Sequence, residues 1–397
     1  METAKRLDGI GEYYFSKKLR EIELLNREGK NIISLGIGSP DQAPHPDVIK
    51  TLQEESAKAN AHAYQSYKGS PKLREAMADW YRKWYGVELN PELEILPMAG
   101  SKEGIMHICM TYVNAGDIVL IPNPGYPTYQ SAAKLAGGNV VSYELRESNH
   151  WKPDFSEIEN IISNRKSTQK SVLMFVNYPQ MPTGQIPDKQ LFKDLIAFAK
   201  GNDILLVHDN PYSFILNDDP MSILQVEGVS DHVIELNSLS KSHNMAGWRL
   251  GMMMASRYHV ENVLRFKSNM DSGMFLPVQL AAAVALRLPS SWYEQVNNLY
   301  RKRRIAVESM LEGLGCQFSK KQAGLFVWAK VPPGFRDGYE LSDLLLYKSN
   351  VFITPGGIFG SAGNEYIRVS LCASEENIVE SKSRMISAGI IKPKQNV

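Results

Sequence analysis

The sequence contains little cysteine, no excess of either charge and no long apolar run, and each absence excludes a class of protein. Three widely spaced cysteines, Cys109, Cys316 and Cys372, form no CxxC pair, so we expect neither structural disulfides nor a metal site. Lysine plus arginine total 44 against 43 aspartates and glutamates, which gives no electrostatic basis for nucleic-acid binding. No run approaches the roughly 20 apolar residues that span a bilayer. Residues 1–12 carry no apolar signal core, so a cytoplasmic protein with no membrane partner is expected.

Several familiar motifs are also missing. The sequence has no HExxH, Walker loop or GxSxG, and Gly36-x-Gly38 lacks the third glycine of a dinucleotide fingerprint. His208 and His243 have no metal-ligand spacing, and we expect both to be core or loop histidines. The basic run 301–304 lies in a predicted helix over 291–314 and is expected to be a solvated helix face.

The pattern of short apolar runs predicts an α/β fold. Runs of four or five residues, most of them separated by helix-like stretches, occur at 118–121, 172–176, 204–207, 233–236 and 250–254. This pattern is typical of a mostly parallel sheet buried on both faces. Helices are predicted over 4–30, 46–60 and 71–85, and another after Gly100 with Ser101 as its N-cap.

The chain is long enough for two domains, and the pattern of predicted helices and strands changes near residue 290. A long helix there precedes predicted strands at 324–329, 351–356 and 366–370. We therefore predict an N-terminal arm (1–45) packed with a small α+β C-terminal domain (290–397), and a large domain between them (46–289).

Polar residues end three of the predicted strands. Asn177, Asp209 and Ser238 follow buried runs, and ligands of parallel sheets bind at the carboxyl ends of strands. We expect these three residues to converge at one edge.

The segment from Ser238 to Gly251 contains the richest chemistry. It places Ser238, Ser240, Lys241 and Arg249 between two apolar runs, as in a strand, a polar loop and a second strand. A lysine amine beside groups that can hold a phosphate suits an imine with pyridoxal phosphate, whose ring then withdraws electrons. Alone, the segment is also compatible with a surface loop.

The other requirements of such a site have candidates elsewhere in the chain. Gly100-Ser101-Lys102 opens a helix whose N-terminus suits a phosphate, although a turn glycine and a plain cap explain it equally. Asp209 suits the protonated ring nitrogen, since a carboxylate at a buried strand end needs a partner, but a loop or cap aspartate is the alternative.

Three further side chains suit the remaining tasks. Tyr212 suits the ring oxygen and Tyr126 the ring face, although each is also compatible with packing alone. Arg368 suits a substrate α-carboxylate because a guanidinium binds it with two hydrogen bonds; a surface-strand arginine is the alternative.

Taken together, these motifs resemble the class I/II, fold-type I aminotransferases over roughly residues 10–385. They follow the order of that family: glycine turn, GSK helix, PGYP tyrosine, PTG loop, Asp-x-x-Tyr, SxSK, arginine and a late arginine. The resemblance implies a large domain with a seven-stranded, mostly parallel sheet and a small C-terminal domain. It implies pyridoxal phosphate as cofactor and a Schiff base at Lys241, which also moves the proton. The other roles it implies are Asp209 at the ring nitrogen, Tyr212 at the ring oxygen, Tyr126 on the ring, Ser101, Lys102, Ser238 and Arg249 at the phosphate, and Arg368 and Gly38 at the substrate.

The resemblance also implies a homodimer with shared sites. Tyr64 precedes Gly69 in Tyr64-Gln65-Ser66-Tyr67-Lys68-Gly69 and matches a tyrosine that family members lend to the partner's phosphate. Within the family the chain is most similar to the LL-diaminopimelate aminotransferase branch, through Gly125-Tyr126-Pro127, the segment 244–249 and the segment 267–273.

One position departs from the family pattern. Met181 stands where the family has an asparagine that donates to the ring oxygen, and a thioether cannot donate. Tyr212 would then be the donor, unless Gln180, Asn177 or a water substitutes. We predict that the imine formed by Lys241 keeps its proton to higher pH than in relatives with asparagine.

The expected activity is transfer of an amino group from an amino acid to a 2-oxo acid by a ping-pong mechanism. A pyridoxal-phosphate-dependent β-C–S lyase is an alternative, because it uses the same lysine and carboxylate. A non-catalytic cofactor-binding relative is a second alternative, prompted by Met181. The sequence does not define the substrate pair.

Overall fold

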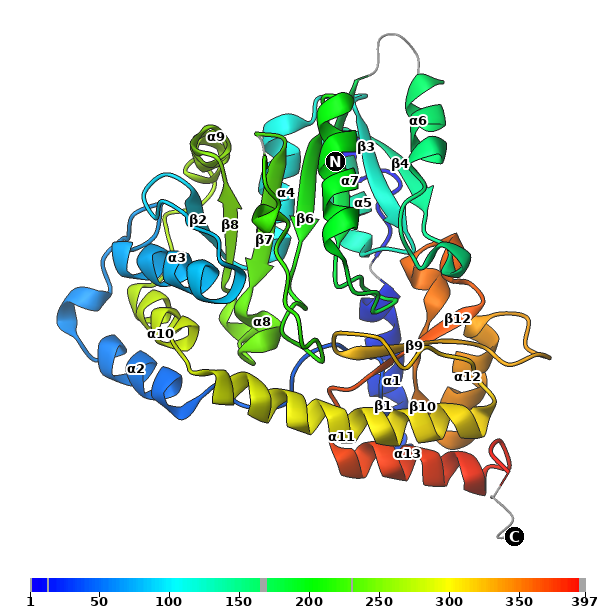
Figure 1. Ribbon diagram of the computed structural model, residues 1–397. Coiled ribbons are helices and arrows are strands. Elements are labelled where there is room, and N and C mark those ends of the chain that lie inside the picture. The colour runs from blue at the N-terminus through cyan, green and yellow to red at the C-terminus, as the bar shows by residue number, and fades with distance from the viewer. Residues whose placement is uncertain (1, 13, 165–169, 230, 393–397) are drawn as a thin grey trace.

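The computed structural model describes residues 2–12, 14–164, 170–229 and 231–392. Within these ranges the centre is a seven-stranded sheet with the order β2-β8-β7-β6-β5-β3-β4 (Figure 1). β8 is antiparallel to both of its neighbours, and the other pairs are parallel. The strands are β2 Ile95–Met98, β3 Ile118–Asn123, β4 Asn139–Glu144, β5 Ser171–Asn177, β6 Leu205–Asp209, β7 Val233–Ser238 and β8 Gly251–Ala255. The predicted fold class, with a mostly parallel sheet, is confirmed.

Apolar residues on both faces of the sheet form its cores. On β5, Leu173 and Phe175 belong to one core, whereas Met174 and Val176 belong to the other. Helices packed in the first core are α4 Ser101–Tyr112, α5 Pro127–Leu135 and α9 Arg257–Lys267. Helices packed in the second are α2 Pro46–Ser56, α3 Pro71–Tyr85, α6 Phe155–Ser163, α7 Lys189–Gly201 and α10 Leu276–Leu286. Because helices cover both faces, only the strand ends remain open for a ligand.

A second group of elements follows the long helix α11 (Ser290–Leu314), which crosses the lower part of the molecule in Figure 1. Its three-stranded antiparallel sheet has the order β11-β12-β9. The elements are β9 Phe326–Lys330, β11 Thr354–Pro355, β12 Tyr366–Ser370, α12 Gly338–Ser349 and α13 Glu375–Ser387. This small C-terminal sheet is the second part of the predicted fold class.

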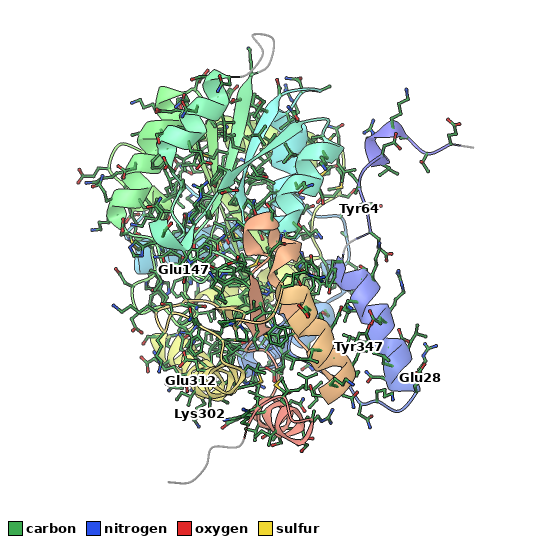
Figure 2. The ribbon with its side chains drawn as sticks, turned by 90° about the vertical axis from the view of Figure 1, so that its right-hand side faces the viewer. Glu28, Tyr64, Glu147, Lys302, Glu312 and Tyr347 are labelled. Carbon is green, nitrogen blue, oxygen red and sulfur yellow. The ribbon has the colours of Figure 1, made fainter. Side chains whose placement is uncertain are left out.

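The N-terminal segment packs against this C-terminal group. β1 (Ile33–Ser34) pairs in parallel with β10 (Val351–Phe352), and α1 (Tyr14–Arg27) packs Ile22 against Leu346 and Phe352. Tyr347 of α12 donates a hydrogen bond to Glu21 of α1, and Figure 2 shows Tyr347 beside that helix. The N-terminal segment and the C-terminal elements are therefore packed together although they are far apart in the sequence.

Several local expectations were wrong. The helix expected over 4–30 begins at Tyr14, after a separate 3-10 turn at Lys5–Leu7, and Gly9 between them has a φ of +74° that a right-handed helix does not allow. The helix expected over 46–60 ends at Ser56. Gly100, not Ser101, is the N-cap of α4, and no side chain caps this helix. The loop expected between β7 and β8 contains the one-turn helix α8 (Leu239–Ser242).

The basic run on α11 is not a solvated face throughout. Arg303 is 2% exposed, and its two terminal nitrogens donate to the carboxylate of Asp41 over 2.8 and 2.7 Å. Its Nη1 also donates to the carbonyl of Leu371. The expectation failed because a run of like charges does not show which of its members faces a distant carboxylate.

The structure agrees with other expectations about single residues. His208 and His243 are buried core residues, and burial lowers the pKa of His243 to about 3. All three cysteines are free and buried.

None of the helices in the described ranges combines the length and the apolar character that crossing a membrane requires.

Candidate active site

A cavity of about 500 Å³ opens at the carboxyl ends of β5, β6 and β7. The last residues of these strands, Asn177, Asp209 and Ser238, all line it, so the predicted convergence is confirmed. The predicted site residues that line the cavity are Gly38, Ser101, Lys102, Tyr126, Asn177, Asp209, Tyr212, Ser238, Ser240, Lys241, Arg249 and Arg368. Two other predicted residues do not line the cavity. Gly100 directly precedes the lining residue Ser101, and Tyr64 is 91% exposed.

Lys241 lies on the one-turn helix α8, directly after β7. The Ser238 hydroxyl accepts a hydrogen bond from the Ser240 backbone N–H over 3.1 Å and so caps this turn. The Lys241 Nζ donates to the Gly38 carbonyl over 2.5 Å. Burial lowers the pKa of Lys241, and the nearby guanidinium groups of Arg368 and Arg249 lower it further. A lowered pKa favours the neutral amine, the form that attacks a carbonyl carbon.

Asp209 provides a buried carboxylate at the end of β6. Its Oδ2 accepts a hydrogen bond from the Tyr129 hydroxyl over 2.9 Å, and its backbone carbonyl accepts one from the Asn177 side chain over 2.5 Å. Its Oδ1 is buried with no hydrogen-bond partner among the described residues. Burial raises the pKa of Asp209 to about 6, although Tyr129, His208 and Lys241 oppose the rise. The orphaned oxygen calls for a donor from a bound molecule, because an unpaired buried acceptor is costly.

The N-terminus of α4 and Arg249 together form an anion site. Gly100 has a φ of +88°, and the Arg249 guanidinium lies directly against it, so a side chain at this position would collide with that group. Arg249 is held in place because it donates to the carbonyls of Ala246 and Ala99 over 3.0 and 3.2 Å. The positive end of a helix dipole and a nearby guanidinium together favour a phosphate.

Arg368 is a buried arginine of β12 and not a surface-strand residue. It is 4% exposed, and its Nη2 donates to the Gly36 carbonyl over 3.0 Å. Its guanidinium carbon lies 3.7 Å from the ring centroid of Phe326 and 4.5 Å from that of Phe359. The rings hold the guanidinium toward the cavity by cation–π contacts, where it can bind a carboxylate.

Met181 has a specific place in this arrangement. Arg368 donates from Nη1 to the Met181 sulfur over 3.3 Å, and the Met181 backbone N–H donates to the Asn177 side-chain oxygen over 2.7 Å. Gln180 is bound at both ends of its amide, to the Pro124 carbonyl and the Thr183 N–H, each over 2.9 Å. Gln180 is therefore engaged with backbone and does not line the cavity, whereas Tyr212 does.

Sequence reasoning missed Tyr129 and the aromatic residues around Arg368. A signal for Tyr129 was present, since it follows Tyr126 by three residues in a helix opened by Pro127, which puts both on one face. Phe326 and Phe359 carried no such signal, because they reach Arg368 through the pairing of β9 with β12 and through the 3-10 helix Gly356–Phe359 that follows β11.

Comparison with known proteins agrees with this geometry. The family model for aminotransferase class I and II matches residues 30–381. The LL-diaminopimelate aminotransferase of Halothermothrix orenii is 39% identical over 392 residues, covering 98% of this chain and 99% of the relative. The enzyme of the same name from Moorella thermoacetica is 38% identical over 387 residues, 97% of this chain and 98% of the relative. Among solved structures, apo-BacF from Bacillus subtilis is 33% identical with a TM-score of 0.92 and covers 98% of each chain. A Thermus thermophilus aspartate aminotransferase double mutant, at 24% identity, shares the fold with a TM-score of 0.89, over 98% of this chain and all of the other.

The chain belongs to the class I and II aminotransferases. It is an enzyme that transfers an amino group between an amino acid and a 2-oxo acid, and its similarity to the LL-diaminopimelate aminotransferases extends over nearly the full length. Neither the lyase nor the non-catalytic alternative is favoured by these relatives.

Proposed function

We propose that this aminotransferase works with pyridoxal phosphate held in the 500 Å³ cavity, with Lys241 as the amine that bonds it. The orphaned Oδ1 of Asp209 is the observation that carries the proposal, because a protonated ring nitrogen supplies the donor that this oxygen lacks. When bound, the cofactor supplies an aldehyde for imine formation and a ring that withdraws electrons from the substrate Cα.

The side chains that line the cavity divide into four tasks. Asp209, held by Tyr129 and Asn177, would pair with the ring nitrogen of the cofactor and favour its protonated form. Tyr212 and Tyr126 both line the cavity; with the cofactor bound, Tyr212 would donate to its ring oxygen and Tyr126 would cover its ring face. Ser101, Lys102, Ser238, Ser240 and Arg249 bind the phosphate, with Gly100 leaving room for the guanidinium.

The substrate is held and moved by residues on the other side of the cavity. Arg368 binds its α-carboxylate and Gly38 lies against it. Lys241 would accept the proton released from the substrate Cα at its Nζ and donate it back later in the half-reaction, which a lowered pKa favours. The two half-reactions form a ping-pong cycle between an amino acid and a 2-oxo acid.

Borohydride reduction followed by peptide mass spectrometry tests where the cofactor bonds. Reduction converts an imine into a stable amine, so the cofactor mass is expected on the peptide that contains Lys241. Lys102 is the internal control, because it is the other lysine that lines the cavity. A label on Lys102, or no label at all, would refute the proposal.

We also infer that two copies of the chain share their sites through Tyr64. Exposed apolar side chains gather on two adjacent loops: Tyr64 and Tyr67 on one, and Met270 and Phe275 on the other. The loops are adjacent because Gly273 lies against the backbone of Gln65 and Ser66. Exposed apolar surface of this kind supports self-association.

A subunit-mixing experiment tests the shared site. Lys241→Ala and Tyr64→Ala subunits, each impaired alone, are denatured and refolded together. Mixed dimers contain one site with both Lys241 and Tyr64 intact, so activity is expected to return above that of either variant. Gel filtration reports the dimer, and the absence of any recovery would contradict a role for Tyr64 across the interface.

Two further assignments go with this proposal. Residues 1–45 act as an arm packed on a small domain that begins near residue 290, where α11 starts, and residues 46–289 bind the cofactor. The cytoplasm is the proposed location, supported by three buried cysteines that remain free.

A further inference from the structure

Asn123, the last residue of β3, binds the C-terminal group through both ends of its side-chain amide. Its Nδ2 donates to the Ser361 hydroxyl over 2.9 Å, and its Oδ1 accepts from the Ala362 backbone N–H over 3.1 Å. Both partners lie on the 3-10 helix Ser361–Gly363, which precedes β12. Asn123 is 8% exposed, so these partners replace the water that its buried amide has lost. We call these two hydrogen bonds the Asn123 clasp.

The backbone of the turn after β3 makes a third link to the same region. The Gly125 N–H donates to the Phe359 carbonyl over 2.8 Å, and Phe359 ends the 3-10 helix Gly356–Phe359. The Phe359 ring centroid lies 4.5 Å from the Arg368 guanidinium carbon. Since Tyr126 directly follows Gly125, the links join the segment that places Tyr126 to the segment packed on Arg368.

Gly360 allows the two segments to approach this closely. It lies between the two 3-10 helices and has a φ of +129°, a conformation that favours glycine. A Cβ at Gly360 would collide with the Asn123 side-chain amide. The chain therefore passes over the amide at the position where it has no side chain of its own.

Two cavities limit how far packing can hold these segments in place. A second cavity of about 300 Å³ lies beside Asn123 and Gly125. Tyr126 and Phe359 line both this cavity and the 500 Å³ cavity of the candidate active site. A cavity offers no protein atoms for a side chain to pack against. Hydrogen bonds between the segments therefore have a large share in fixing the position of Phe359 relative to Tyr126.

We propose that Asn123 is a positioning residue that holds Arg368 at its working distance from the cofactor ring. By binding the helix Ser361–Gly363, the clasp fixes Phe359 and with it the guanidinium on which Phe359 packs. The inference rests on the proposed function, since it uses Arg368 as the anchor of the α-carboxylate and Tyr126 as the cover of the ring. Loss of the clasp weakens binding of the carboxylate and leaves the cofactor site intact.

Two reagents separate the carboxylate anchor from the rest of the site. Aminooxyacetate and methoxyamine share an aminooxy nitrogen, which bonds to the cofactor carbon and displaces the Lys241 amine, but only aminooxyacetate has a carboxylate for Arg368. In Asn123→Ala holoenzyme we expect the second-order rate constant to fall at least about fivefold for aminooxyacetate and less than about twofold for methoxyamine, the effect of about one lost hydrogen bond. Stopped-flow absorbance measures both. Equal falls for the two reagents would overturn the positioning role.

Two further variants serve as matched controls for the clasp. Ser361→Ala removes the acceptor of the Asn123 Nδ2 and keeps the bond to Ala362, so a smaller selective fall is expected. Asn149→Ala removes a side-chain amide hydrogen bond of the same kind, to the Lys152 carbonyl over 3.1 Å, away from the cavity. It should keep the wild-type rate with both reagents. A selective fall in Asn149→Ala would contradict the inference.

Hydrogen exchange in cofactor-free protein tests the clasp without the cofactor. The Ala362 amide should exchange at least about fivefold faster in Asn123→Ala than in the wild type, because its acceptor is lost. The Leu206 amide of the central strand β6, which donates to the His232 carbonyl, reports whether the fold is intact and should not change. Unchanged exchange at Ala362 would show that the clasp does not hold this segment.

The outcomes distinguish this inference from the proposed function. If borohydride placed no label on Lys241, the proposed function would fail, and with it the role of Asn123 toward the ring, whatever the exchange at Ala362. If Lys241 were labelled but the two reagents slowed equally in Asn123→Ala, the proposed function would stand and the positioning role would fail.

Discussion

The hydroxyl of Tyr129 donates a hydrogen bond to Oδ2 of Asp209 over 2.9 Å, while Oδ1 of the same carboxylate has no partner among the described residues. Tyr129 thus orients the carboxylate and leaves one oxygen for a ligand in the cavity. Burial disfavours the charged form of a carboxylate and raises the pKa of Asp209 to about 6.

The stability of the apoprotein should therefore depend on pH through Asp209. Burial raises the pKa of Asp209 from 3.8 to about 6, so between these values the folded state binds more protons than the unfolded state. The free energy of unfolding is expected to fall as the pH rises through this window, by up to about 3 kcal/mol. Urea unfolding of cofactor-free protein from pH 4 to pH 7 measures it. Asp209→Asn should lose this component, and an unchanged pH slope in that variant would contradict the assignment.

Loss of the Lys241 amine should abolish transamination without unfolding the protein. In Lys241→Ala we expect the rate to fall at least about 10²–10⁴-fold, the usual contribution of a positioned proton-transfer group. Single-turnover assays with amino acid measure the rate, and circular dichroism reports the fold. Turnover at the wild-type rate would rule out Lys241 as the catalytic amine.

Met181 should set the pH at which the bound cofactor changes its absorbance. An asparagine at this position adds a donor beside the ring oxygen and favours its ionised form, by on the order of 1–3 kcal/mol. In Met181→Asn we expect the midpoint of the absorbance titration to move to lower pH by about 1 unit or more. Met181→Leu is the matched control, because it adds no donor and should keep the wild-type midpoint. Equal midpoints in all three proteins would show that this position does not act on the ring oxygen.

The pair of the buried Arg303 and the partly exposed Asp41 should contribute to stability. Burial alone would raise the pKa of Asp41, but the hydrogen bonds and charge of Arg303 outweigh it and lower that pKa. Arg303→Met breaks the pair and is expected to cost more than about 1 kcal/mol, the upper end for solvent-exposed pairs, because Arg303 is buried and also donates to the Leu371 carbonyl. Arg301→Met is the control on the same helix, since Arg301 is 51% exposed and should change stability by less than about 1 kcal/mol. Chemical denaturation of both variants decides between a structural pair and a solvated face; equal losses would refute the pair.

Features encoded within short segments were predictable from the sequence. The runs that became β3, β5, β6, β7 and β8 were all recognised, because strands buried on both faces read as continuous apolar stretches. β4 was not predicted, since this edge strand mixes exposed and buried residues. Asn177, Asp209 and Ser238 were placed together for a simple geometric reason: parallel strands bring their carboxyl ends to one edge.

The candidate site likewise contains some residues that could be predicted from the sequence and others that could not. The groups around Lys241 lie within or next to recognisable motifs, so an amine, a carboxylate and an anion site at one sheet edge could be predicted from the residues alone. The distant residues that complete these groups are visible only in the folded chain: Tyr129 on Asp209, Phe326 and Phe359 around Arg368, and Asp41 on Arg303. The reason is physical, because such contacts depend on how helices and loops pack over the sheet, and residues far apart in the chain leave no local pattern to read.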